Sequence, residues 1–345
     1  MNFTPGPANI SEGVQKAFGS LPISHRSLTF REVFQTTKRL LCQLVKSRRV
    51  ELLLGSGTLA NDVIAAHLSL DRTRGLILSN GEFGNRLIDH ATRFGLSFDV
   101  LEVNWGDAFE RTEIESILDR ASNVTWLWAV HCETSTGVLN DAAMLKELCK
   151  TRGARLCLDC IGSIGTIPLN LQDVYFASGV SGKGLGSYPG LSMVFYNQDA
   201  VLSPKRLPRY LDLGLYAASD GIPFTQSSNL LYALETALRR FDSNKPFDDL
   251  ARLSFWLRGR LREMGFSLIA SDRHSSPAVV TVSLPETLRS HDIGLRLQKD
   301  GYLLGYESEY LLKKNWVQIC LMGECSQEAI ESLLSVLSNL CIPAL

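Results

Sequence analysis

Short apolar runs alternate with helical stretches through the first two thirds of the chain, and this alternation restricts the fold more than any other feature. Apolar runs typical of buried strands occupy residues 51–54, 76–79, 98–103, 125–130, 155–160, 173–177 and 190–196. Helical patterns precede or separate several of them, at 29–47, 58–69 and 84–95. Because parallel strands are usually joined by helical crossovers, the alternation predicts an α/β fold with a mostly parallel sheet covered by helices on both faces.

The order of elements changes after Gly265. Two predicted helices then mix with three strands in a compact α+β pattern: strands at 278–283, 302–306 and 315–321, helices at 290–299 and 326–340. At the other end, Pro5-Gly6-Pro7 cannot be helical. The sequence therefore predicts an N-terminal extended segment (1–20), a large domain (21–245) and a smaller C-terminal domain that begins with a linking helix (246–345).

Charge and cysteine usage favour a small-molecule partner and a reducing compartment. The chain carries 35 basic and 36 acidic residues, so no basic excess suggests nucleic acid. Its eight cysteines are scattered, and Cys157 and Cys160 flank Asp159 within an apolar run, which favours buried thiols over a metal site. The first residues lack a targeting pattern, and no apolar run reaches the roughly 20 residues that span a bilayer. We therefore expect a cytoplasmic protein with no metal, no nucleic-acid partner and no membrane contact.

A glycine-rich turn follows the first predicted strand. Gly55-Ser56-Gly57-Thr58 stands between an apolar strand and the start of a helix. Free backbone N–H groups and the positive end of a helix bind anions at such a turn, and glycine lets a ligand approach the backbone closely. The same residues would also serve as a tight turn with Thr58 as N-cap. Because the turn lacks the full dinucleotide-binding and P-loop patterns, phosphate binding and simple capping both stay open.

An acid and a lysine follow at places where a parallel sheet binds ligands. Asp159 ends the apolar run 155–160, and the carboxyl ends of parallel strands are where ligands lie in open sheets. A carboxylate there can hold a protonated pyridine nitrogen, although a helix N-cap is the other interpretation. Lys183 lies in a glycine-rich loop between two apolar strands. A partly desolvated lysine there supplies the neutral amine that Schiff-base chemistry needs, whereas a lysine taken singly is more often solvated.

With these residues in place, the chain resembles the class V aminotransferases, which are fold-type I enzymes dependent on pyridoxal 5'-phosphate. The likeness is strongest to alanine–glyoxylate, serine–pyruvate and 2-aminoethylphosphonate–pyruvate aminotransferases. The matching segments fall in the same order and cover most of the chain: TPGP (4–7), GSGT (55–58), NGEFG (80–84), HCETSTGVLND (131–141), LDCIGSIG (158–165), SGKGLGSYPG (181–190), PFTQSSNLLYAL (223–234) and ICLMG (319–323).

The resemblance implies how the cofactor ring would be held. Lys183 would form the Schiff base and would also carry the proton during transfer. Asp159 would bind the ring nitrogen, while Phe83 and Ile161 would cover the two faces of the ring. The hydroxyl of Thr134 would lie near the 3-hydroxyl of the ring. His131, in the same segment as Thr134, would serve in packing and hydrogen bonding rather than as a base.

The resemblance also implies how the phosphate would be held and how the subunits would assemble. Ser56, Gly57 and Thr58 would bind the cofactor phosphate. Thr225 matches a residue that reaches the phosphate of a partner subunit, so we expect a homodimer.

Two positions are candidates for binding the substrate. One departs from the family pattern, and the other resembles a stretch of phosphoserine aminotransferases. Relatives place an arginine that binds the substrate α-carboxylate where this chain has Gln318, which offers two N–H donors and no charge. Either the amino donor lacks an α-carboxylate or another cation replaces the arginine. Ser24-His25-Arg26 resembles a stretch of phosphoserine aminotransferases that recognises a distal anion, so Arg26 is a candidate, with an ordinary surface arginine as the alternative. A smaller departure is Gly182, where many relatives have a polar phosphate-binding side chain.

The expected activity is transfer of an amino group from a small amino donor to a keto acid such as pyruvate or glyoxylate, by way of the Lys183 Schiff base. The missing arginine leaves a pyridoxal-phosphate lyase, decarboxylase or epimerase as an alternative on the same fold. A cysteine desulfurase fits less well, because that group stacks a histidine where Phe83 stands. A catalytically silent homologue fits poorly with the retained Lys183 and Asp159.

Overall fold

The computed structural model describes residues 1–121 and 123–341. Within them, seven strands form the central sheet, in the spatial order β2 (Arg49–Leu54), β10 (Leu191–Tyr196), β9 (Phe176–Val180), β8 (Arg155–Asp159), β5 (Val124–Val130), β3 (Arg74–Ser79) and β4 (Ser97–Glu102). Only β10 runs antiparallel to its neighbours. The predicted α/β fold with a mostly parallel sheet is therefore confirmed.

Alternate residues of the central strands enter two hydrophobic clusters, because successive side chains point to opposite faces of a sheet. In β3, Leu76 and Leu78 belong to one cluster and Ile77 to the other. The first cluster is covered by α2 (Leu28–Val45), α5 (Arg111–Arg120), α6 (Ala142–Arg152) and α8 (Ser228–Leu238). The second is covered by α3 (Gly57–Leu68), α4 (Glu82–Arg93) and α7 (Leu213–Ala218). Because both faces of the sheet are buried, the sequences of the central strands are continuous apolar runs.

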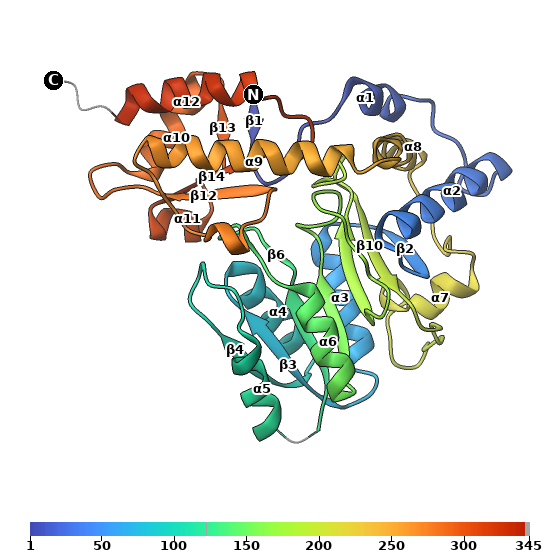
Figure 1. The fold of residues 1–345 in the computed structure, drawn as a ribbon. Helices are drawn as coiled ribbons and strands as arrows, with labels where there is room; N and C mark the ends of the chain where they lie inside the picture. Colours follow the sequence, from blue (N-terminus) through green and yellow to red (C-terminus); the bar gives the residue numbers. More distant parts are fainter. Residues whose placement is uncertain (122, 342–345) are drawn as a thin grey trace.

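The C-terminal part builds its own smaller sheet, whose described strands are β11 (Ser267–Leu268), β12 (Val279–Ser283) and β14 (Trp316–Cys320), all antiparallel. It packs with α9 (Lys245–Glu263), α10 (Ser290–Lys299) and α12 (Gln327–Cys341) around a separate hydrophobic cluster, and α11 (Glu309–Lys314) precedes β14. In Figure 1, α9 runs from this part toward the α8 end of the large sheet. A domain boundary near residue 245 stays a prediction.

The N-terminal segment differs from the extended form expected for residues 1–20. Strand β1 (Asn2–Phe3) pairs in parallel with β13 (Leu303–Leu304) of the C-terminal part. The chain then forms helix α1 (Glu12–Phe18), so the extended form is wrong beyond Ser11. The Ser11 hydroxyl accepts from the backbone of Val14, and such a cap starts a helix as soon as the Pro-rich stretch has passed.

Some element bounds also shift. The strand expected at 173–177 lies at Phe176–Val180, because a turn precedes it in which Asp173 has a left-handed φ of 68°. Helix α8 ends at Leu238, and the chain continues as the 3₁₀ helix η2 (Arg239–Phe241). Short elements that were not expected complete the fold: β6 (Cys132–Glu133), β7 (Val138–Leu139), η1 (Arg209–Leu211) and η3 (Asp272–His274).

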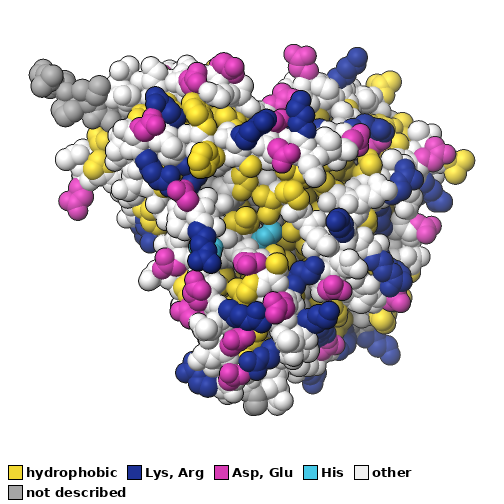
Figure 2. Space-filling view, viewed as in Figure 1, with side chains coloured by type: hydrophobic (Ala, Val, Ile, Leu, Met, Phe, Trp, Pro, Cys, Tyr) yellow, Lys and Arg dark blue, Asp and Glu magenta, His cyan; other side chains and the backbone are white. Residues whose placement is uncertain are grey.

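The surface carries charges of both signs. Figure 2 shows lysine and arginine interspersed with aspartate and glutamate, and hydrophobic side chains gathered around a hollow in the middle of this face. Among the described residues, no helix combines the length and the apolar character that crossing a membrane would require.

Candidate active site

The carboxyl edge of the central sheet brings most of the predicted site residues together. The turn after β2, the start of α4 after β3, the end of β8 and the loop after β9 all meet there. They line one cavity of about 360 Å³, whose walls include Ser56, Gly57, Thr58, Phe83, Asp159, Ile161 and Lys183. Seven residues predicted from separate stretches of sequence thus share a single cavity of a size typical of small-molecule sites.

The glycine-rich turn lies at the N-terminus of α3. Ser56 is the N-cap residue, yet its side chain makes no capping hydrogen bond, and the side chains of Ser56 and Thr58 are exposed toward the opening. Gly57 is buried, and a Cβ there would lie 2.5 Å from Cδ1 of Ile161. The N-terminus of α3 therefore offers free backbone N–H groups, the exposed hydroxyls of Ser56 and Thr58, and space at Gly57, which together suit an anion.

Asp159 is held at the end of β8 by two hydrogen bonds. One carboxylate oxygen accepts from the backbone N–H of Ile161 at 2.9 Å, and the other accepts from Nδ2 of Asn61 at 2.8 Å. Asp159 and Asn61 are both buried. The carboxylate is therefore fixed in orientation while it faces the cavity, as a partner for a cationic ring nitrogen requires.

Lys183 lies in a tightly folded loop between β9 and β10. The Ser181 hydroxyl donates to the carbonyl of Tyr188 at 2.6 Å and accepts from the N–H of Leu191 at 3.2 Å, which closes the loop. A Cβ at Gly182 would lie 2.8 Å from Cα of Pro189, so the residue before the lysine has no room for a side chain. Nζ of Lys183 lies 5.0 Å from the ring centroid of Phe83. The loop thus places one amine against the aromatic wall of the cavity.

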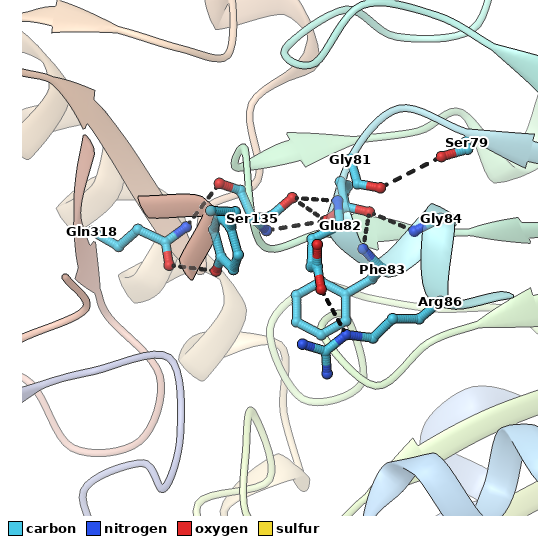
Figure 3. Close-up of polar contacts among 10 residues, drawn as sticks. Ser79, Gly81, Glu82, Phe83, Gly84, Arg86, Ser135 and Gln318 are labelled. Carbon is cyan, nitrogen blue, oxygen red and sulfur yellow. Dashed lines mark hydrogen bonds and ion pairs between the residues drawn. The ribbon is translucent and has the colours of Figure 1, made fainter. Parts of the chain in front are cut away.

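Phe83 is positioned by a carboxylate that sequence reasoning did not single out. One carboxylate oxygen of Glu133 accepts from the backbone N–H groups of Phe83 and Gly84, at 3.1 and 3.0 Å, and so caps α4 (Figure 3). Its other oxygen accepts from the backbone N–H of Ser135 at 3.1 Å. A Cβ at Gly81 would collide with the side chains of Glu133 and Ser135, so the cap needs glycine there. Burial raises the pKa of the Glu133 carboxyl, and hydrogen bonds from the Ser135 hydroxyl and from these backbone N–H groups oppose the rise.

Besides Gln318, three predicted residues lie outside the cavity wall of this chain. Thr134 is buried beside it, and a Cβ at Gly162 would meet the Thr134 methyl at 2.7 Å. Thr225 and Arg26 are both exposed. Neither Thr225 nor Arg26 therefore contributes to the cavity wall of its own chain.

Gln318, expected to meet the substrate, is fully buried in β14. Its Nε2 donates toward the carbonyl oxygens of Thr134 and Ser135, at 2.5 and 3.0 Å, and toward Oγ1 of Thr281 at 2.9 Å. Both N–H groups of the amide are therefore used inside the protein, and the expectation that Gln318 offers them to a substrate is not supported by this geometry.

Further residues of the cavity wall were missed from the sequence. Asn61 follows Thr58 by three positions on α3, while Arg86 and His90 follow Phe83 by three and seven positions on α4. The signal was helical spacing from the predicted residues, together with one buried polar residue in the apolar helix α3. The guanidinium of Arg86 lies 4.9 Å from the Phe83 ring centroid, and its Nε is bonded to Glu82.

His131 lies buried beneath the carboxyl edge. Its Nδ1 is 3.0 Å from the hydroxyl of Ser163, and burial lowers the pKa of its imidazole to about 4, against the opposing charge of Asp141. A histidine with so low a pKa stays neutral near neutral pH, so His131 serves in packing and hydrogen bonding.

The residues of the cavity fit pyridoxal phosphate. Within the described part of the chain, Oδ1 of Asn61 is buried without a hydrogen-bond partner, and Gly57 leaves a cradle that any Cβ would fill. The open helix start suits the phosphate, Asp159 suits the ring nitrogen, Phe83 and Ile161 suit its faces, and Lys183 suits its aldehyde. Among the described residues, no three His, Cys, Asp or Glu side chains lie close enough to hold a metal ion.

Comparison with known proteins gives a consistent family. A family model described as Aminotransferase class-V matches residues 16–202. A protein of Synechococcus sp. named soluble hydrogenase, small subunit, is 29% identical over 87% of this chain and 82% of its own length. A 2-aminoethylphosphonate–pyruvate transaminase of Lysinibacillus sphaericus is 23% identical over 97% and 96%. The crystal structure of an alanine–glyoxylate aminotransferase from Nostoc sp. superposes with a TM-score of 0.89 at 26% identity, covering 99% of this chain and 95% of that chain.

Proposed function

The chain belongs to the class-V aminotransferase family, and we propose that it moves an amino group from a small amino donor to a keto acid such as pyruvate or glyoxylate. It is a pyridoxal-phosphate-dependent transferase of fold type I. One observation carries the proposal: the single cavity that combines Lys183, Asp159 and the open start of α3. Relatives named for pyruvate and glyoxylate support these two acceptors.

The cofactor, when bound, supplies an electron sink that makes the Cα–H bond of the amino donor acidic. The N–H groups at the start of α3 and the hydroxyls of Ser56 and Thr58 would hold its phosphate. The carboxylate of Asp159 would keep the ring nitrogen protonated. Phe83 and Ile161 would clamp the ring between them and keep water from its faces.

Lys183 would carry the proton. When the donor is bound, Nζ as a free amine would accept the proton that leaves the donor Cα, hold it within the cavity and give it up again to complete the transfer. His131 does not compete for this role, because its Nδ1 faces Ser163 and the pKa of its imidazole is about 4.

We extend the proposal to a homodimer in the cytoplasm. Thr225 is exposed, as is Arg26, and a partner subunit that covers them would bring them toward a neighbouring site. Leu21 and Leu28, on either side of Arg26, are 86% and 77% exposed, which fits a surface covered by a second chain. Free buried thiols such as Cys132 and Cys157 fit a reducing compartment.

The activity is tested with a panel of amino donors and two acceptors. The purified holoenzyme is incubated with alanine, serine, 2-aminoethylphosphonate or simple amines, together with pyruvate or glyoxylate, and both products are measured by mass spectrometry. We expect one donor class to yield its oxo product and an equal amount of aminated acceptor, and Lys183→Ala to yield neither. Decarboxylated or eliminated products without amino transfer would contradict the proposal.

The dimer is tested by mixing two defective chains. If Thr225 completes the partner's site, a hybrid of Lys183→Ala and Thr225→Ala subunits contains one intact site. Activity should then recover when the two variants are mixed under conditions that exchange subunits. A monomeric mass in solution, or no recovery from hybrid dimers, would contradict the shared site.

A further inference from the structure

We propose that Gln318 is a positioning residue that couples the small sheet to the aromatic wall of the cofactor cavity, rather than a group that binds the substrate. The inference rests on the proposed function, since it concerns how the cofactor is held. The contacts of the side chain then account for the glutamine that stands where relatives have an arginine.

The first link joins two strands of the small sheet to the segment that follows β6. Gln318 lies opposite Thr281 in the β12–β14 pairing, and their side chains share a hydrogen bond of 2.9 Å. The same amide donates to the carbonyl oxygens of Thr134 and Ser135. Its Oε1 accepts from the hydroxyl of Tyr310 at 3.4 Å, so every polar atom of the amide has a partner within the protein.

The second link runs from this segment to α4. The N–H of Ser135 donates to the Glu133 carboxylate at 3.1 Å, and its hydroxyl accepts from the N–H of Glu82 at 3.1 Å. Glu133 in turn accepts from the N–H groups of Phe83 and Gly84. Figure 3 shows these contacts as one continuous path from Gln318 through Ser135 to the first turn of α4.

Burial makes this path stiff. Gln318, Glu133 and Ser135 are all fully buried, so no water can replace a broken hydrogen bond. A buried donor or acceptor that loses its partner is strongly unfavourable, so the arrangement is held as a unit. The ring of Phe83 lies at its end, against the amine of Lys183. A shift at β14 is therefore transmitted to the wall on which the cofactor ring stacks.

The test compares two near-isosteric variants without any substrate present. Gln318→Met removes both N–H donors and the acceptor, and Gln318→Glu keeps the shape but has no N–H. The matched control is Gln327→Met, the same substitution at an exposed position of α12. The dissociation constant of pyridoxal phosphate and the induced circular dichroism of the bound cofactor are measured, with the melting temperature as a check on folding.

We expect both Gln318 variants to bind pyridoxal phosphate about threefold to tenfold more weakly, the range that one loosened aromatic stack predicts, with a reduced induced signal. The control should match the wild type. Unchanged cofactor binding and dichroism in a folded Gln318→Met protein would overturn the inference, whether or not KM for a carboxylate donor rises. A wild-type chain that binds no pyridoxal phosphate would instead refute the proposed function.

A double-mutant cycle tests whether Gln318 affects cofactor binding through Phe83, because residues that act through one another have non-additive effects. In a Phe83→Leu background, Gln318→Met should weaken cofactor binding much less than in the wild type. Equal effects in both backgrounds would overturn the coupling. If Gln318→Met does not fold, Thr281→Val removes one acceptor of the bridge with little change in shape, and the same cycle is run with it.

Discussion

The roles of single residues at this site depend on their partners as much as on their chemistry. Asp159 is one of many buried polar residues, but Asn61 and the backbone of Ile161 fix both of its oxygens toward the cavity. Lys183 is one loop lysine among several, but the Ser181 contacts close its loop against the sheet edge. Asp159 is distinguished by neighbouring groups that hold its carboxylate, and Lys183 by a closed loop that places it in the cavity wall.

At Asp159 we predict a large effect of a small change. Asp159→Asn keeps the shape but loses the charge that would pair with a protonated ring nitrogen. Truncating one partner of a buried charged pair costs about 2–5 kcal/mol, so cofactor affinity should fall by roughly 30-fold or more. Absorbance titration with pyridoxal phosphate measures it. Asp173→Asn, an exposed position whose left-handed φ asparagine tolerates, is the control, and equal affinity in the two variants would contradict the assignment.

The sequence alone identified those site residues that belong to a local pattern in the chain. A strand-end acid, a glycine-rich turn and a loop lysine are recognisable from their neighbours in the chain. Asn61 has only its helical spacing from Thr58, and Glu133 has no such signal, because the groups that they contact lie 98 and 50 residues away. Gln318 was noticed only as a departure from a resemblance, and its contacts with Thr134 and Ser135, more than 180 residues away, depend on tertiary packing.

At the scale of elements, apolar runs and helical periodicity were sufficient for the long strands and helices. Two bounds failed for local reasons: the Ser11 cap started a helix within the N-terminal segment, and the turn at Asp173 delayed β9. The short hairpin β6–β7 was missed because two-residue strands carry no periodicity. Yet this hairpin carries Glu133 and touches the small sheet, so it decides how the two parts of the molecule meet.

The packing of the β6–β7 hairpin against β12 predicts that Gly137 cannot be replaced by a residue with a side chain. Gly137 has a φ of 81°, and a Cβ there would lie 2.8 Å from the carbonyl oxygen of Val279 in β12. Gly137→Ala should lower the free energy of unfolding by about 1–3 kcal/mol, through backbone strain plus the clash. Gly95→Ala is the matched control, since Gly95 also has a positive φ but nothing within 4 Å. Urea denaturation that shows equal losses in the two variants would contradict the close packing of the hairpin.

At the scale of the whole molecule, the fold places the site at the carboxyl edge of the large sheet. The large sheet supplies the turn, the acid and the lysine at its carboxyl edge, and the small sheet closes against the same edge through the hairpin β6–β7. The fold of the alanine–glyoxylate aminotransferase from Nostoc sp. agrees with this arrangement over 99% of the chain. The fold class was predictable because strand–helix alternation leaves few topologies open.

Whole-molecule stability should depend on pH through buried histidines. Burial lowers the pKa of His131 and of His67 from 6.5 to about 4. The unfolded chain therefore binds protons that the folded chain does not, and stability is full above pH 6.5 and falls as the pH drops toward 4. For His131 the loss is on the order of 3 kcal/mol.

Urea unfolding of the cofactor-free chain, at a series of pH values across this window, measures the effect. His131→Asn should flatten the fall in stability between pH 6.5 and about 4, because it removes one of the two histidines. His291→Gln, at an exposed position, should leave the profile unchanged. A profile that His131→Asn does not alter would show that its burial has no part in acid destabilisation.

The central claim is that Lys183 carries the cofactor, and borohydride reduction tests it most directly. The purified protein is loaded with pyridoxal phosphate, reduced, digested and examined by mass spectrometry. We predict one phosphopyridoxyl group per chain, on the peptide that contains Lys183, and none on Lys183→Ala. A label on another lysine, or no label on the loaded wild-type protein, would contradict the account.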